Sequence, residues 1–109
     1  MTRNLFEGIP RELPEELVEE LVRTPGARVE RIVSRGHRTS EGEWYDQAWD
    51  EWVVVLSGRA RLRIEGEPDE IALASGDSLL LPAHVRHRVE WTDPAADTVW
   101  LALHYGAAA

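Results

Sequence analysis

Short stretches of alternating apolar and polar residues, separated by turn residues, make up the chain from residue 27 onward. Such alternation is typical of strands that are buried on one face. Gly, Pro, Asp and Ser divide the stretches, and no interval between them is long enough for a helix. We therefore predict an all-β fold, a sandwich or barrel of antiparallel strands. The predicted strand segments begin at Val29, Trp44, Glu51, Ala60, Glu70, Ser78, His87 and Thr98.

The first 26 residues have a different spacing. Leucines recur every four residues, a spacing that places them on one face of a helix: Leu13, Leu17 and Leu21. Pro14 suits a first helical turn, and the sequence Thr24-Pro25-Gly26 ends the segment. We predict one short N-terminal helix that packs on the barrel. The predicted organisation is a helical brace over 1–26, a single barrel over 27–106 and a disordered tail over 107–109.

The charge of the chain excludes several classes of partner. Its net charge is −8, all 12 basic residues are arginine, and lysine is absent. An acidic protein of this kind is a poor ligand for a phosphate backbone, so we expect no nucleic-acid binding. The longest apolar run, Trp52–Leu56, is too short to span a membrane, and the N-terminus lacks a secretory signal. We expect a cytoplasmic protein without cysteine chemistry.

Two spaced motifs in the strand region resemble those of the cupin superfamily. Glu51 is followed by six residues and then Gly58, which is similar to the second half of the first cupin motif. Gly76, Pro82 and His87 have the spacing of the second motif. The resemblance covers about residues 28–105 and implies a jelly-roll β-barrel. In cupins with the full motifs, three His and one Glu hold a divalent metal inside the barrel.

The chain departs from the cupin pattern where the first motif has its pair of His. Two alignments of that pair are open, one on Tyr45 and Gln47 and the other on Trp44 and Asp46, and neither supplies imidazole. Strand alternation places Tyr45 and Gln47 on one face and Asp46 on the other. We prefer the first alignment, because Trp44 then packs outside the pocket. The predicted metal ligands are therefore Gln47, Glu51 and His87, with Tyr45 as a catalytic residue that orients the ligand or donates a proton.

Other residues remain candidates around this pocket. Shifted by one residue, the register would give a site of Asp46, Glu51 and His87. His104 shares a strand face with Trp100, and it either reaches the same pocket or is a hydrogen-bonded residue on the strand. We expect His84 to be a turn residue and His37 to be solvated. Arg86 and Arg88 flank His87, so we expect them to point away from it, to the surface.

Function is predicted from this site rather than from the fold, which supports many chemistries. We predict a metal-binding cupin that binds or transforms a small molecule, as an oxygenase or isomerase would, with Fe, Mn, Ni or Zn as the ion. The alternative is a metal-free module that binds a small ligand without catalysis. A third interpretation is a structural barrel that only associates with itself. Edge strands in such a small barrel also favour a homodimer.

Overall fold

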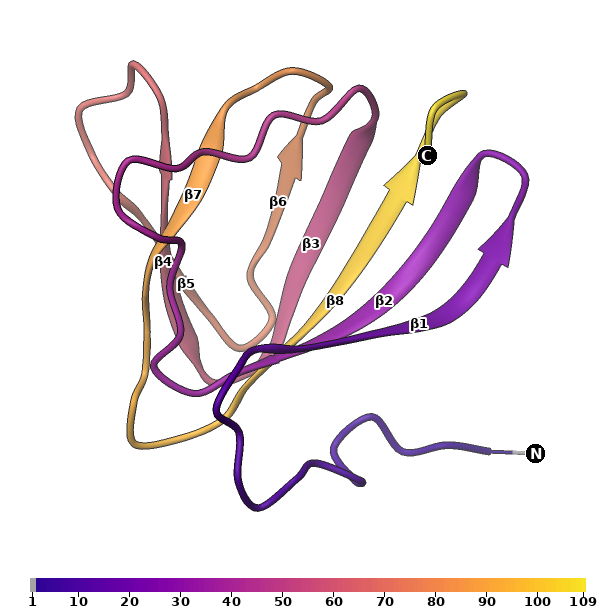
Figure 1. The fold of residues 1–109 in the computed structure, drawn as a ribbon, viewed down its shortest axis with the longest axis vertical. Coiled ribbons are helices and arrows are strands. Elements are labelled where there is room, and N and C mark those ends of the chain that lie inside the picture. The colour runs from indigo at the N-terminus through magenta and orange to yellow at the C-terminus, as the bar shows by residue number, and fades with distance from the viewer. Residues whose placement is uncertain (1) are drawn as a thin grey trace.

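The computed structural model describes residues 2–109, which fold into two antiparallel β-sheets that face each other (Figure 1). The larger sheet has the strand order β1-β2-β8-β3-β6, and the smaller has the order β5-β4-β7. This arrangement is the predicted all-β barrel. The strands are β1 (Leu17–Thr24), β2 (Ala27–Ser34), β3 (Asp50–Ser57), β4 (Arg59–Ile64), β5 (Ile71–Ala74), β6 (Ser78–Leu81), β7 (His87–Thr92) and β8 (Thr98–Tyr105).

The predicted N-terminal helix is wrong, because residues 2–109 contain no helix. Residues 17–24 instead form β1, which pairs with β2 along its whole length. A spacing of four residues fits a strand as well as a helix, since it is a multiple of the two-residue strand period. The pairing with β2 decides between them, and the Pro25-Gly26 turn, with Gly26 at φ 80°, joins the two strands as a hairpin.

Residues 2–16 form an irregular segment that is hydrogen-bonded to one arginine of the large sheet. Arg31 on β2 is fully buried, and its guanidinium donates hydrogen bonds to the carbonyls of Leu5 and Glu7 at 3.0 and 2.6 Å. It also forms an ion pair with Glu19 on the neighbouring strand β1. Figure 1 shows this segment running across the end of the barrel at which β1 begins. The ordering of the segment places residue 16 beside the barrel interior.

The core lies between the two sheets. It is formed by side chains from both sheets: Val53, Val55, Ala60, Leu62, Leu73, Leu81, Trp100 and Ala102. Between β3 and β4, Gly58 has a φ of 95°, and a Cβ there would lie 2.7 Å from the carbonyl oxygen of Asp97. Glycine is therefore required at this turn both for its backbone conformation and for the close approach of the next chain segment.

The loop before β3 is not the strand that we predicted over Trp44–Gln47. Only Tyr45 is paired, in an isolated bridge with His87. Arg88, predicted to be at the surface, is 7% exposed and donates hydrogen bonds to the carbonyls of Thr39, Ser40 and Glu43. The loop has an irregular backbone, so its carbonyls need donors from outside, and the arginine supplies them.

Within residues 2–109, no helix is long and apolar enough to span a membrane.

Candidate functional site

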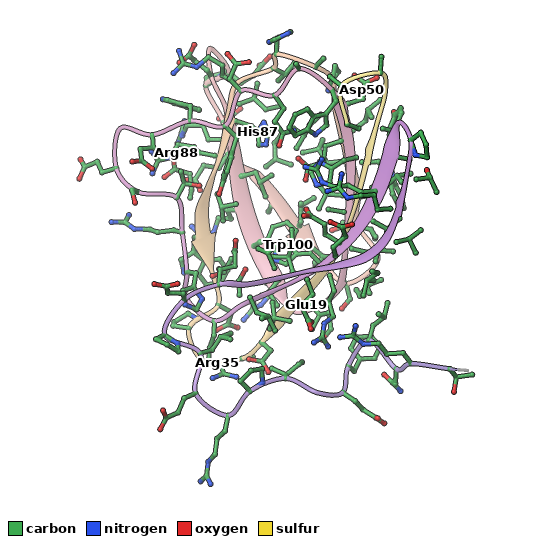
Figure 2. All side chains as sticks on the ribbon, turned by 45° about the vertical axis from the view of Figure 1, so that its right-hand side comes forward. Glu19, Arg35, Asp50, His87, Arg88 and Trp100 are labelled. Carbon is green, nitrogen blue, oxygen red and sulfur yellow. The ribbon has the colours of Figure 1, made fainter. Side chains whose placement is uncertain are left out.

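A cavity of about 230 Å³ lies between the two sheets. One part of its wall is apolar and is formed by Val18, Ile32, Val53, Leu62, Leu81, Val89 and Trp100. The other part is polar and is formed by Glu16, Arg28, Glu30, Tyr45, Gln47, Glu51, His87 and His104. Figure 2 shows His87 and Trp100 between the sheets, with Arg88 on the outer side of the strand that carries His87. A mainly apolar cavity with a few convergent polar groups is typical of a small-molecule site.

Strand register brings Glu51 and His87 to this cavity. Glu51 lies near the start of β3, directly opposite His104 of β8, and is 8% exposed. His87 begins β7 in the facing sheet and is 5% exposed. Its Nε2 atom lies 3.9 Å from Oε1 of Glu51. The two residues that match the cupin motifs therefore converge from opposite sheets.

The hydrogen bonds of His87 determine which of its two nitrogen atoms carries the hydrogen and which has a free lone pair. Nδ1 lies 3.0 Å from the carbonyl oxygen of Val85, and a carbonyl oxygen only accepts hydrogen bonds. Nδ1 therefore carries the hydrogen in the neutral ring, and Nε2 has a free lone pair directed toward Glu51. This is the arrangement that metal-binding histidines use, in which a backbone carbonyl orients the ring.

Gln47 and Tyr45 complete the polar end of the cavity. The side-chain amide of Gln47 donates a hydrogen bond to Oε1 of Glu51 at 3.1 Å. The ring of Tyr45 stacks on that of His87, with centroids 5.5 Å apart, and two backbone hydrogen bonds join the two residues. Asp46 points the other way and contacts the exposed His84 at 2.9 Å. The structure therefore brings together Tyr45, Gln47, Glu51 and His87 and leaves Asp46 outside.

The phenol of Tyr45 lies in a negative environment. Burial raises the pKa of Tyr45 above 10.0, and the charges of Glu16 and Glu51 raise it further. A hydrogen bond with Thr39 lowers the pKa but does not outweigh these effects. The phenol is therefore protonated at neutral pH, and Tyr45, which is 47% exposed, lies between the cavity and the solvent.

His104 also lines the cavity, but both of its nitrogen atoms have partners. The indole of Trp49 donates a hydrogen bond to Nδ1 at 2.8 Å, so Nε2 carries the hydrogen and donates it to Glu30 at 2.7 Å. Arg28 lies 3.7 Å from the same glutamate and over the ring of Trp49. His104 therefore belongs to a closed hydrogen-bonded group in the wall, and it offers no lone pair to a ligand.

Glu16 and Arg88 are site residues that the sequence did not identify. Glu16 lies in the segment that we predicted to be a helix on the outside of the barrel, yet it lines the cavity. Arg88 fixes the loop that precedes Tyr45. No local pattern signals either role, because both depend on how an irregular segment packs against a distant strand.

The donor atoms at this end of the cavity offer a metal ion only two strong ligands, Glu51 and His87. Within residues 2–109, no three side chains of His, Cys, Asp or Glu come together in a way that could hold a metal. An ion at Glu51 and His87 would therefore need the amide oxygen of Gln47 as its third protein ligand. Carboxylate, amide and imidazole donors suit a divalent first-row ion, and the remaining positions would stay open.

Comparison with known proteins gives a consistent result. A candidate mannose-6-phosphate isomerase from Ralstonia eutropha JMP134 is 44% identical, with a TM-score of 0.94, over 98% of this chain and 99% of that chain. An RmlC-like cupin protein from Desulfovibrio desulfuricans is 17% identical, with a TM-score of 0.76, over 96% and 95%. A cupin superfamily protein from Desulfitobacterium hafniense DCB-2 is 18% identical, with a TM-score of 0.72, over 89% and 83%.

No protein with a curated description matches the chain significantly. The family described as the cupin domain matches residues 32–104, a span that contains the two motifs around Glu51 and His87. The matched span runs from β2 to β8 and includes both sheets. Sequence motifs, sheet topology and structural neighbours therefore agree that the chain belongs to the cupin family.

Proposed function

We propose that this cupin binds a small molecule in the cavity between its sheets, beside a divalent metal ion held by Gln47, Glu51 and His87. The observation that carries the proposal is the 3.9 Å approach of the His87 Nε2 lone pair to a carboxylate oxygen of Glu51. At this distance the two atoms are too far apart for a hydrogen bond with each other, so both can bind a third atom. A cation or a hydrogen-bond donor of a ligand would satisfy both at once.

The burial of Glu51 supports a cation at this position. Its carboxylate is 8% exposed, accepts a hydrogen bond from Gln47, and has no arginine partner within residues 2–109. Burying a carboxylate without a positive charge is costly, so a bound cation or a proton is expected to compensate. The amide of Gln47 would turn its oxygen toward a metal, because the nitrogen now faces Glu51.

The expected chemistry follows from the coordination positions of the ion that the protein leaves open toward the cavity. A bound Fe, Mn, Ni or Zn ion would supply a Lewis acid next to the cavity. Tyr45, protonated at neutral pH, would orient the ligand or donate a proton to it. The apolar wall would exclude water around the reacting group. These features support an isomerase- or oxygenase-like reaction, and the Ralstonia relative carries the name of a candidate isomerase.

A metal-free binding module is the second candidate. The absence of three acidic or imidazole side chains around one point in residues 2–109 favours it. In this case, Glu51, Gln47 and His87 would form hydrogen bonds with the ligand directly. The cavity, the neutral phenol and the apolar wall would serve the same ligand.

Metal analysis separates the two candidates. Untagged protein purified without chelators should contain about one divalent ion per chain. Glu51→Gln and His87→Gln should each remove it, whereas Glu65→Gln, which alters an exposed residue, should not. A metal content near zero in protein supplied with Fe, Mn, Ni or Zn would instead support the metal-free module, provided that the protein still binds a small ligand.

The predicted homodimer has a specific surface to support it. One row of apolar residues crosses the outer face of all five strands of the large sheet. From β1 to β6, the row is Val22, Val29, Leu103, Trp52 and Leu80. Val22 and Leu80 are 54% and 50% exposed, and a second copy would cover them. Light scattering would test whether the protein is a dimer in solution.

The cytoplasmic location and the absence of nucleic-acid binding stay predictions.

A further inference from the structure

Glu16 reaches the cavity from outside the matched cupin domain. It directly precedes β1, and its Oε2 accepts a hydrogen bond from the hydroxyl of Ser34 at 2.5 Å. The indole of Trp100 donates in turn to that hydroxyl at 3.2 Å. Ser34 is fully buried and Trp100 is 3% exposed. The carboxylate is therefore held by a buried hydrogen-bond chain rather than placed on a freely moving surface side chain.

The charges around the cavity do not balance. Three carboxylates line it, those of Glu16, Glu30 and Glu51, against the single guanidinium of Arg28. Arg28 lies beside Glu30, which also receives the hydrogen bond from His104. Within residues 2–109, neither Glu16 nor Glu51 forms an ion pair with an arginine. Glu51 is a ligand of the proposed metal ion, so Glu16 is the carboxylate of the cavity that keeps no positive partner among these residues.

A second observation points to a ligand group in this acidic region. The imidazole of His87 is 5% exposed, and its Nε2 has no hydrogen-bond partner within residues 2–109, although it lines the cavity. The atom can be reached from the cavity, so it is available to a ligand group. The proposed metal ion, or a hydrogen-bond donor of the ligand in the metal-free protein, would bind this nitrogen and Glu51 together. Glu16 lies outside that pair and would bind a positive charge of the ligand.

The rest of the wall limits the size and nature of such a molecule. The volume of about 230 Å³ equals that of roughly eight water molecules at about 30 Å³ each. Seven apolar residues, among them Trp100, face the same space. Tyr45 adds an aromatic face beside the carboxylates. These dimensions fit a small molecule with an apolar body and one positively charged end.

We infer that the ligand is a small organic cation, a protonated amine with an apolar body, and that Glu16 is the residue that selects it. This inference rests on the proposed small-molecule site and adds the class of ligand. A phosphorylated sugar is disfavoured, because its charge would face Glu16, and Arg28, the one arginine that lines the cavity in residues 2–109, already lies beside Glu30. The sugar phosphate in the name of the Ralstonia relative would therefore not be the ligand of this cavity.

Binding of a matched series of aromatic compounds tests the inference. Isothermal titration at pH 7 and about 0.15 M salt, where exposed charges are screened beyond about 8 Å, would compare benzylamine, benzyl alcohol, benzoate and mannose 6-phosphate. We expect benzylamine to bind about tenfold or more tightly than benzyl alcohol, the gain typical of a charged hydrogen bond, and the two anions not to bind. Glu16→Gln should reduce this preference to about threefold or less, and Glu15→Gln should retain it.

The neighbouring glutamate makes the control specific. Glu15 is exposed, does not line the cavity, and carries the same charge, so its replacement changes the net charge equally. Tighter binding of an anion, no binding of benzylamine, or equal effects of the two variants would overturn the inference. Metal content tests the proposed metal site separately. Protein that holds the ion but does not prefer the amine would contradict only the amine inference. Protein that prefers the amine but holds no ion would contradict only the proposed metal site.

Discussion

His87 and His104 face the same cavity, and the hydrogen bonds of their neutral rings place the hydrogen on opposite nitrogen atoms. His87 holds its hydrogen on Nδ1, toward the carbonyl of Val85, whereas His104 holds its hydrogen on Nε2, toward Glu30. The difference arises because each ring has one partner that can only accept or only donate. One imidazole is consequently available to a ligand, and the other is part of the wall.

Nitrogen-15 NMR of the imidazoles should detect these two tautomers. Long-range proton–nitrogen correlations in metal-free protein are expected to show Nδ1–H for His87 and Nε2–H for His104. Zn²⁺ should shift the Nε2 resonance of His87 and leave His104 unchanged, because Trp49 and Glu30 occupy both of its nitrogen atoms. The same tautomer in both rings, or a zinc shift at His104, would contradict the hydrogen bonding described above.

The ionisation of Tyr45 should occur above the ordinary value of 10.0. Ultraviolet titration near 295 nm would follow it, with Tyr45→Phe to identify the step, since the chain has only two tyrosines. Glu16→Gln should lower the pKa of Tyr45, because it removes one of the charges that raise it. An unchanged pKa in that variant would place Glu16 away from the phenol.

The same shift has a consequence for stability. Above pH 10, the phenol of the unfolded chain ionises while that of the folded chain stays neutral, so proton release favours unfolding. The free energy of unfolding should therefore fall as the pH rises past 10, and fall less in Tyr45→Phe. Urea denaturation at a series of pH values measures both slopes.

Arg88 should contribute far more to stability than its neighbour Arg86. Arg88→Ala leaves the carbonyls of Thr39, Ser40 and Glu43 without their donor, and we expect a loss of about 2–4 kcal/mol. Arg86 forms only an exposed ion pair with Glu65, so Arg86→Ala should cost at most about 1 kcal/mol. Urea denaturation compares them, and equal losses would show that the loop does not depend on Arg88.

Two turn glycines should respond differently to alanine. Gly58 and Gly76 have similar φ angles of 95° and 89°, so the conformational strain of Ala should be about 1–2 kcal/mol in both. Only at Gly58 would the new Cβ meet backbone atoms, at 2.7 Å, whereas at Gly76 nothing lies within 4 Å. We expect Gly58→Ala to cost about 1–3 kcal/mol more than Gly76→Ala in urea denaturation. Equal costs would mean that the chain near Asp97 moves aside without loss.

The sequence by itself determined most strands after residue 27, the turns between them and two residues of the site. Glu51 and His87 were predicted because their spacings to Gly58 and Pro82 resemble the cupin motifs. Tyr45 and Gln47 were preferred over Asp46 for the inner side because Trp44 would then pack outside the pocket, and both line the cavity although the segment is not a strand. The metal and catalytic roles of these residues stay predictions.

The tertiary structure decided the N-terminal region, the burial of Arg88 and the place of Glu16. Leucines at a spacing of four residues suit a helix or a strand equally, and only pairing with β2 selects the strand. Arg88 is buried because a distant loop needs donors for its carbonyls, and Glu16 enters the cavity because Ser34 holds it there. These outcomes depend on contacts between residues far apart in the chain, which local spacing does not encode.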